Sequence, residues 1–144
     1  MTLPKLSADE LHRLLGGEFP QMFGAKGALS IERLEQRGCR VRQAFRANTL
    51  RPGGTISGVA MMSLADVTMY IAVLAAIGWV PLAVTTNLSI NFLRKPGPRD
   101  LLAECRLLKL GKRLAVGEVT IFSDGMEEPV AHATTTYSIQ QADG

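Results

Sequence analysis

The stretch between Pro52 and Leu93 contains no lysine, arginine, histidine or glutamate, and Asp66 is its single ionisable carboxylate. Within it, residues 57–77 form an apolar run between Ser57, which suits a helix N-cap, and Gly78, which suits a helix end. A helix that is apolar on every side must be surrounded by protein or by lipid. Asp66 and the strand-like runs that follow disfavour a membrane span. We therefore expect a core helix wrapped by a sheet.

A short amphipathic helix is predicted near the N-terminus, from Ser7 to Leu15. Ser7 suits the N-cap and Glu10 follows three residues later, which is the pattern of a capping box. We expect Gly16 and Gly17 to end this helix. The N-terminal region lacks the apolar segment of a signal peptide, and two cysteines are too few for a disulfide framework. Both observations favour a cytoplasmic protein.

Two strands are predicted before the long helix, at residues 28–36 and 39–47, with Gly38 at the turn between them. In the second, CRVRQAFRA, the residues alternate, so one face is expected to be solvated and basic. More strand-like runs follow the helix and are separated by turn residues. They cover about residues 82–93, 101–110, 113–123 and 129–139.

This order of elements indicates an α+β fold, in which one long helix packs against an antiparallel sheet. The strands come as hairpins rather than alternating with helices, which disfavours a doubly wound sheet. A chain of 144 residues suits one domain, spanning residues 1–144 with its core at about 28–139. A net charge of +3 gives no support for nucleic-acid binding, and two widely separated histidines offer no metal site, so neither is expected.

Asp66 is costly in an apolar helix unless it is hydrogen-bonded or functional. It could work as an acid or base. It could equally bond to Ser63, to Thr68 or to the backbone of a partner chain and only fix the packing. The sequence leaves both interpretations open.

The start of the long helix is the second candidate feature. Residues 53–58, GGTISG, bring a flexible backbone to a helix N-terminus, whose free N–H groups can hold a developing oxyanion. Gly58 and Asp66 are eight residues apart, which is about 12 Å along a helix, so one helix cannot aim both at the same carbonyl. Two copies packed antiparallel about a two-fold axis could do so, and a dimer with two equivalent sites is therefore the economical functional hypothesis.

Several segments together resemble the PaaI-like acyl-CoA thioesterases of the hotdog fold, and the resemblance covers about residues 30–139. These segments are SGVAMMSLADVTMY (57–70), VTTNLSINFLRKPG (84–97), LLKLGKRLAVGEV (107–119) and VAHATTTYSI (130–139).

The resemblance implies a hotdog fold, in which chains pair edge to edge as dimers and often as dimers of dimers, and hydrolysis of acyl-CoA thioesters. Asp66 matches the catalytic aspartate, which activates a water or attacks as the nucleophile. Gly58 matches the glycine whose N–H polarises the thioester carbonyl. Thr85 matches the serine or threonine that helps to hold the water. No cofactor is implied, since coenzyme A enters as part of the substrate.

The helix start departs from the family pattern. Where the family usually has His-Gly-Gly, this chain has Ser57, Gly58 and Val59. The position of a common upstream asparagine is occupied by Arg51, and Asn48 lies nearby but out of register. These departures make a non-catalytic acyl-CoA or lipid binder the alternative hypothesis.

Substrate-binding residues are expected in two groups. Apolar side chains of the helix would line the acyl site, together with Ser57 and Asn48 at its start. Basic residues between 94 and 113 would hold the phosphates of coenzyme A, with Lys95 and Arg113 favoured because they lie next to turns. The apolar candidates are Met61, Met62, Met69 and Tyr70.

Other enzyme motifs are absent. The glycines of residues 53–58 have the spacing of a P-loop, but Val59 and Ala60 replace its lysine and hydroxyl residue. No serine-hydrolase elbow is present. A triad of Ser57, His132 and Asp66 is disfavoured because His132 lies within a threonine-rich strand.

Overall fold

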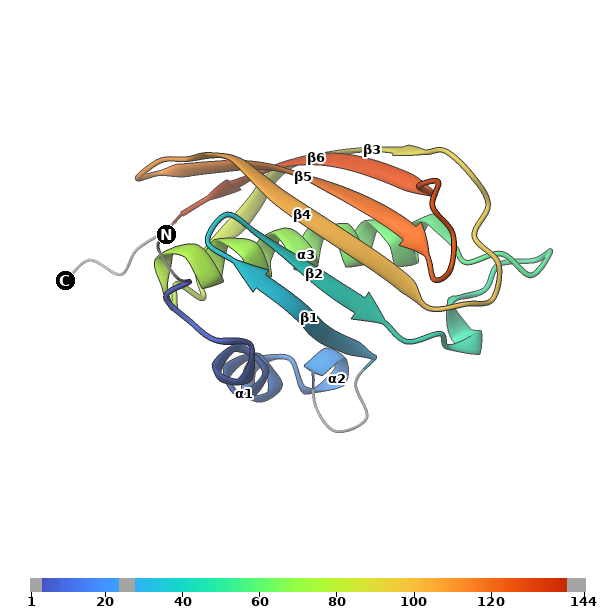
Figure 1. Cartoon of the computed structure of the whole chain (residues 1–144), viewed down its shortest axis with the longest axis horizontal. Coiled ribbons are helices and arrows are strands. Elements are labelled where there is room, and N and C mark those ends of the chain that lie inside the picture. The colour runs from blue at the N-terminus through green and yellow to red at the C-terminus, as the bar shows by residue number, and fades with distance from the viewer. Residues whose placement is uncertain (1–3, 24–27, 140–144) are drawn as a thin grey trace.

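The computed structural model describes residues 4–23 and 28–139. A six-stranded sheet curves around one long helix, α3 (Gly58–Ile77), and two short helices lie beneath the first strand (Figure 1). This is the α+β arrangement that the sequence predicts. The other elements are α1 (Ala8–Glu18), α2 (Pro20–Phe23), β1 (Leu29–Glu35), β2 (Gly38–Gln43), a 3₁₀ turn η1 (Ala47–Thr49), β3 (Val84–Phe92), β4 (Leu101–Leu110), β5 (Leu114–Ser123) and β6 (Ala131–Ser138).

Helix α3 begins and ends where local sequence signals predict. The Ser57 Oγ accepts a hydrogen bond from the Ala60 N–H at 3.1 Å, and Gly78 closes the helix with a φ of 101°. By length and composition α3 could cross a membrane, but 67% of its most apolar window is buried inside the protein. The protein itself therefore supplies the apolar surroundings that this helix requires.

The sheet has the order β1-β2-β4-β5-β6-β3, and every neighbouring pair is antiparallel. Strand β2 ends at Gln43 rather than at residue 47 as predicted. The reason is a side chain, since the carboxylate of Asp100 accepts the Phe45 N–H at 2.7 Å and the chain leaves the sheet there. Strand β3 lies at one edge of the sheet, where β6 is its only partner among the described strands.

The capping box of α1 is confirmed, because Ser7 and Glu10 each accept the other's backbone N–H. The expected stop at Gly16–Gly17 is wrong, because the helix continues to Glu18. Leu11 and Leu15 are fully buried in the main core, and this packing outweighs the low helix propensity of glycine. The core therefore extends beyond residues 28–139 to α1.

The predicted basic face of β2 is neutralised by neighbouring carboxylates. Arg42 contacts Glu32 at 2.6 Å and both Asp100 and Asp124 at 3.1 Å. These hydrogen bonds raise the pKa of Arg42 above its ordinary value. Arg40 also pairs with Glu32, at 3.1 Å. The basic side chains of this face are therefore paired with carboxylates. Glu32 comes from β1, the predicted hairpin neighbour, whereas Asp100 and Asp124 come from segments that the sequence pattern does not place beside β2.

Candidate functional site

Asp66 is held by two hydroxyl groups that bond to the same carboxylate oxygen. Thr85 Oγ1 donates to Asp66 Oδ1 at 2.5 Å, and the Tyr137 hydroxyl donates to Oδ1 at 2.8 Å. Among the described residues none bonds to Oδ2. Thr68, one of the partners suggested by the purely structural interpretation, does not bond to Asp66, since its hydroxyl donates instead to the Leu64 carbonyl at 2.6 Å. Asp66 is thus fixed through one oxygen and can offer the other to a water or a substrate.

A β-bulge in β3 brings Thr85 to this position. Thr85 pairs with Tyr137 and Asn87 pairs with Thr136, so Thr86 is an extra residue in the strand. The bulge changes which side chains of β3 face the helix. Without it, Thr86 would pair with the helix-facing Tyr137, whereas with it Thr85 does. Thr86 instead donates to the Thr136 carbonyl at 3.3 Å.

Tyr137 is a site residue that the sequence analysis missed. It is 4% exposed, and burial, together with the nearby Asp66 carboxylate, raises its pKa well above the ordinary value. The phenol therefore keeps its proton and donates to Asp66 throughout the neutral range. The available signal was the alternation in β6, whose helix-facing residues Ala131, Ala133 and Thr135 predict that Tyr137 also faces the helix.

Asp66 opens into a cavity of about 440 Å³ between α3, the start of β3 and the two N-terminal helices. The predicted residue Tyr70 lines this cavity, and its hydroxyl donates to the Pro81 carbonyl at 3.0 Å. Burial, and to a lesser degree the charge of Glu18, raises the pKa of Tyr70. The remaining lining residues are Phe19, Met22, Ser63, Val67, Pro81, Ala83, Val84, Thr85 and Tyr137.

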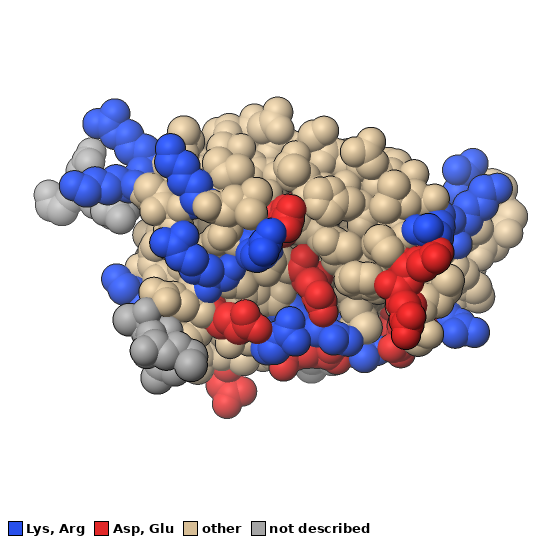
Figure 2. All heavy atoms as spheres, turned by 45° about the horizontal axis from the view of Figure 1, so that its top comes forward, with Lys and Arg blue, Asp and Glu red and all other residues tan. Residues whose placement is uncertain are grey.

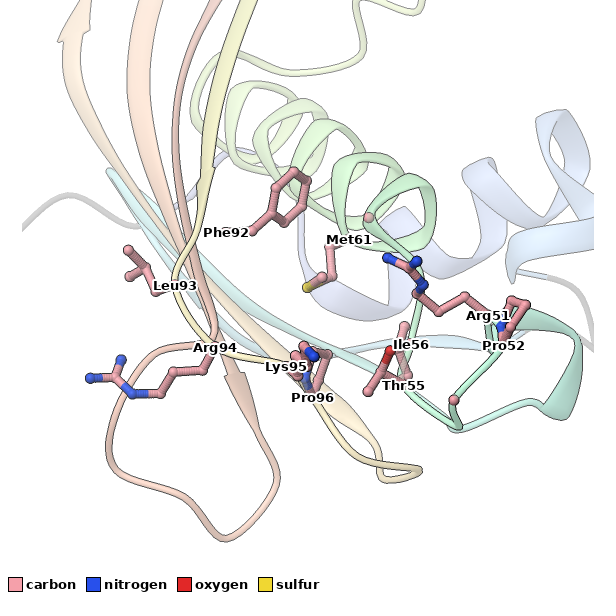
Figure 3. Close-up of a pocket in the computed structure, with 12 residues that line it drawn as sticks. Arg51, Pro52, Thr55, Ile56, Met61, Phe92, Leu93, Arg94, Lys95 and Pro96 are labelled. Atoms are coloured by element: carbon pink, nitrogen blue, oxygen red, sulfur yellow. The ribbon is translucent and has the colours of Figure 1, made fainter.

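A second cavity, of about 650 Å³, lies at the start of α3 (Figure 3). Gly58 is the first residue of the helix, and no acceptor among the described residues takes its N–H. Met61 of α3 and Phe92 at the end of β3 both line this cavity. The Phe92 ring packs directly on Gly58, because a Cβ at that position would lie 3.1 Å from the Phe92 Cζ. The N–H of Gly58 therefore lies beside apolar side chains at the start of the helix.

Basic side chains border the second cavity. Lys95 and Arg51 line it, and Arg51 turns its guanidinium toward the first turn of α3 (Figure 3). Arg94 points away and is engaged with Glu128 at 2.8 Å. Figure 2 shows lysine and arginine at both ends of the face in view, with a broad uncharged area along its upper part.

The remaining predicted residues lie elsewhere or act structurally. Ser57 caps α3, and Met62 is exposed on the same helix. Asn48 is exposed on η1 and lines neither cavity. Arg51, which occupies the position of the family's asparagine, lines the cavity at the start of α3 instead. Arg113 follows β4 at the opposite end of the sheet from Lys95, so within one chain the two are not brought together.

The expectation that Met69 lines the acyl site is wrong. Met69 is fully buried, and its sulfur lies 3.9 Å from the Cys105 thiol. Gly117 makes room for it, since a Cβ there would lie 2.7 Å from the Met69 sulfur. Met69 is therefore part of the packing between α3 and the sheet.

The triad is excluded by the fold. His132 pairs across the sheet with Thr120 and contacts Glu118 at 3.5 Å on the outer face, whereas Asp66 lies on α3 and bonds to residues on the inner face of the sheet. In the part of the chain that the structure describes, no three His, Cys, Asp or Glu side chains are placed to hold a metal ion.

Comparison with known proteins identifies the family. The family model of the thioesterase superfamily matches residues 53–130. A protein of Saccharolobus solfataricus named "Putative esterase SSO1253" is 33% identical over 136 residues, covering 94% of this chain and 87% of that protein.

Solved structures agree in fold. The crystal structure of a putative thioesterase from Silicibacter sp. TM1040 is 48% identical, covers 98% of this chain and 96% of its own, and has a TM-score of 0.87. A point mutant of the phenylacetic acid degradation protein PaaI from Thermus thermophilus is 24% identical, with coverages of 78% and 94% and a TM-score of 0.69. The chain belongs to the thioesterase superfamily and is a thiolester hydrolase with the PaaI-like hotdog fold.

Proposed function

We propose that the protein is an acyl-CoA thioesterase whose active site forms between two copies of the chain. The observation that carries the proposal is the hydrogen bonding of Asp66, which leaves one carboxylate oxygen beside an apolar cavity while the other accepts two hydroxyl groups. Such an oxygen can take a proton from a water molecule.

The pairing of two chains follows from the sheet edge. Strand β3 is an edge strand of nine residues without a charged side chain, and Val84 and Phe92 at its ends are about half exposed. An uncharged, exposed edge of this kind favours pairing with another strand. Antiparallel pairing of two β3 strands brings the Thr85 end of one copy beside the Phe92 end of the other.

This pairing joins the two cavities. Asp66 lies at the Thr85 end, and Gly58 lies under Phe92 at the other end. In one chain they line separate cavities, as their spacing of about 12 Å along the helix requires. In a dimer the Asp66 of one copy faces the Gly58 N–H of its partner, so a homodimer, alone or as half of a tetramer, contains two equivalent sites.

The chemistry follows from these groups. Asp66 Oδ2 takes a proton from water as the water oxygen attacks the thioester carbonyl carbon, and the Gly58 N–H stabilises the oxyanion that forms. The carbon–sulfur bond then breaks, and the proton passes from Asp66 to the departing thiolate, giving a carboxylic acid and coenzyme A. Lys95 and Arg51 would hold phosphates of coenzyme A at the rim.

The test is hydrolysis of a panel of acyl-CoA thioesters, followed by the release of free thiol. We expect turnover by the wild type and a loss of at least about a hundredfold in Asp66→Asn, because the amide cannot accept the proton of water. Asp124→Asn is the matched control, since Asp124 contacts Arg42 on the outer face of the sheet. Equal rates for Asp66→Asn and the wild type would refute the role of Asp66, and tight binding without turnover would favour a non-catalytic binder.

A further inference from the structure

The Asp66 cavity is closed on one side by residues that lie outside the region matched by the family model. Phe19 follows α1 directly and Met22 lies in α2, and both line the cavity. The family match begins at residue 53, so the residues of this wall lie outside the segment that the family model matches. Their identity can therefore differ between members without changing that segment.

Three aromatic rings run from this wall to the carboxylate. The Phe19 ring meets the Tyr70 ring edge-on with centroids 6.3 Å apart, and Tyr70 stacks on Tyr137 at 6.0 Å. Tyr137 in turn donates to Asp66. The rings thus position the N-terminal wall relative to the reacting group.

The cavity has one charged group. Of the described residues that line it, Asp66 is the only carboxylic acid, and no lysine, arginine or histidine is among them. The hydroxyl groups of Tyr70, Thr85 and Tyr137 are already engaged as donors. An acyl group that carries its own carboxylate would therefore be repelled by Asp66, and no cationic side chain in the cavity would compensate its charge.

We propose that Phe19 and Met22 determine which acyl groups the enzyme accepts, and that the cavity takes neutral, apolar acyl groups whose length this wall limits. The proposal rests on the thioesterase function proposed above. With the thioester carbonyl at Asp66, the acyl group extends along the three rings toward Phe19 and Met22. The volume of about 440 Å³ lies within the range of small-molecule sites.

The first test changes the wall. We expect Phe19→Ala and Met22→Ala each to raise the ratio of kcat/KM for dodecanoyl-CoA to that for butyryl-CoA by about tenfold or more, because the removed side-chain atoms make room for additional methylene groups. Phe122→Ala and Met126→Ala are matched controls, since both residues line a hollow on the outer face of the sheet. Met22→Ala keeps the test decisive if Phe19→Ala fails to fold.

The second test compares two acyl groups with the same number of carbons. We expect the wild type to hydrolyse butyryl-CoA with a kcat/KM at least about tenfold above that for succinyl-CoA, because the succinyl group adds a carboxylate. An unchanged chain-length ratio in both wall variants, or equal use of succinyl-CoA, would overturn the inference while leaving the thioesterase function standing. If the wild type cleaves no acyl-CoA at all, the proposed function fails and the inference fails with it.

Discussion

Replacing Gly58 by proline removes one N–H from the proposed site while keeping a residue that suits the start of a helix. Gly58 is the first residue of α3, a position where proline is well tolerated because its N–H has no partner inside the helix. The preceding residue, Ser57, is already extended with a ψ of 153°, as a residue before proline needs to be. The fold should therefore survive the substitution.

The expected loss of activity follows from the role of this N–H. Removing one oxyanion donor costs about 10²–10³ in kcat, or about 2.7–4 kcal/mol. We expect Gly58→Pro to lose this factor in kcat with little change in KM, measured by the release of free coenzyme A under saturating substrate. Thermal unfolding of the same sample checks that the variant is folded.

Gly58→Ala is the matched control, because it also adds a Cβ but keeps the N–H. Its Cβ would lie 3.1 Å from the Phe92 Cζ, and Phe92 is 49% exposed, so the ring can move aside in both variants. We expect the alanine variant to lose less than about tenfold. If the two variants hydrolyse substrate equally well, or equally badly, the N–H is not the polarising donor and the reasoning fails.

Two further predictions concern Tyr137 and the pH dependence of stability. Tyr137→Phe should lower kcat by about tenfold with KM nearly unchanged, since a hydrogen bond to a charged group is worth about 1.5–3 kcal/mol; a change confined to KM would argue against a positioning role. Cys39 and Tyr137 both have a raised pKa in the folded protein. The Cys105 thiol and burial raise the pKa of Cys39, and burial raises the pKa of Tyr137. Above about pH 9–10 the unfolded chain releases these protons and the folded chain keeps them, so the free energy of unfolding should fall as pH rises. Urea titrations at two pH values should show a smaller fall for Tyr137→Phe than for the wild type.

The sequence predicts the parts of this structure that depend on local signals. Ser57 and Gly78 mark both ends of α3, because an N-cap hydroxyl and a glycine in the left-handed region act within one turn of the helix. Asp66 stands out because burying a carboxylate in an apolar helix is costly unless the carboxylate is hydrogen-bonded or functional. These features can be recognised without knowing how the sheet is ordered.

The misplaced residues depend on tertiary structure. The side chains of α3 are apolar all round, so their spacing cannot show that Met69 faces the core while Met62 faces outward. Lys95 and Arg113 are close in sequence, yet the strand β4 separates them by the length of the sheet. Tyr137 comes 71 residues after Asp66, and its contact depends on the pairing of β6 with β3.

The shared nature of the site can be tested by mixing two defective proteins. Asp66→Asn lacks the base and Gly58→Pro lacks the donor, so each homodimer should be inactive. In a mixed dimer, one site combines the intact Asp66 of one chain with the intact Gly58 N–H of the other, and the second site contains both defects. With free exchange, about half of the dimers are mixed and half of their sites are intact, so about a quarter of wild-type activity should return. Differently tagged chains, purified together, would show that mixed dimers have formed. If they form without any recovery, both groups act within one chain, and the pairing of two copies through β3 is not what builds the active site.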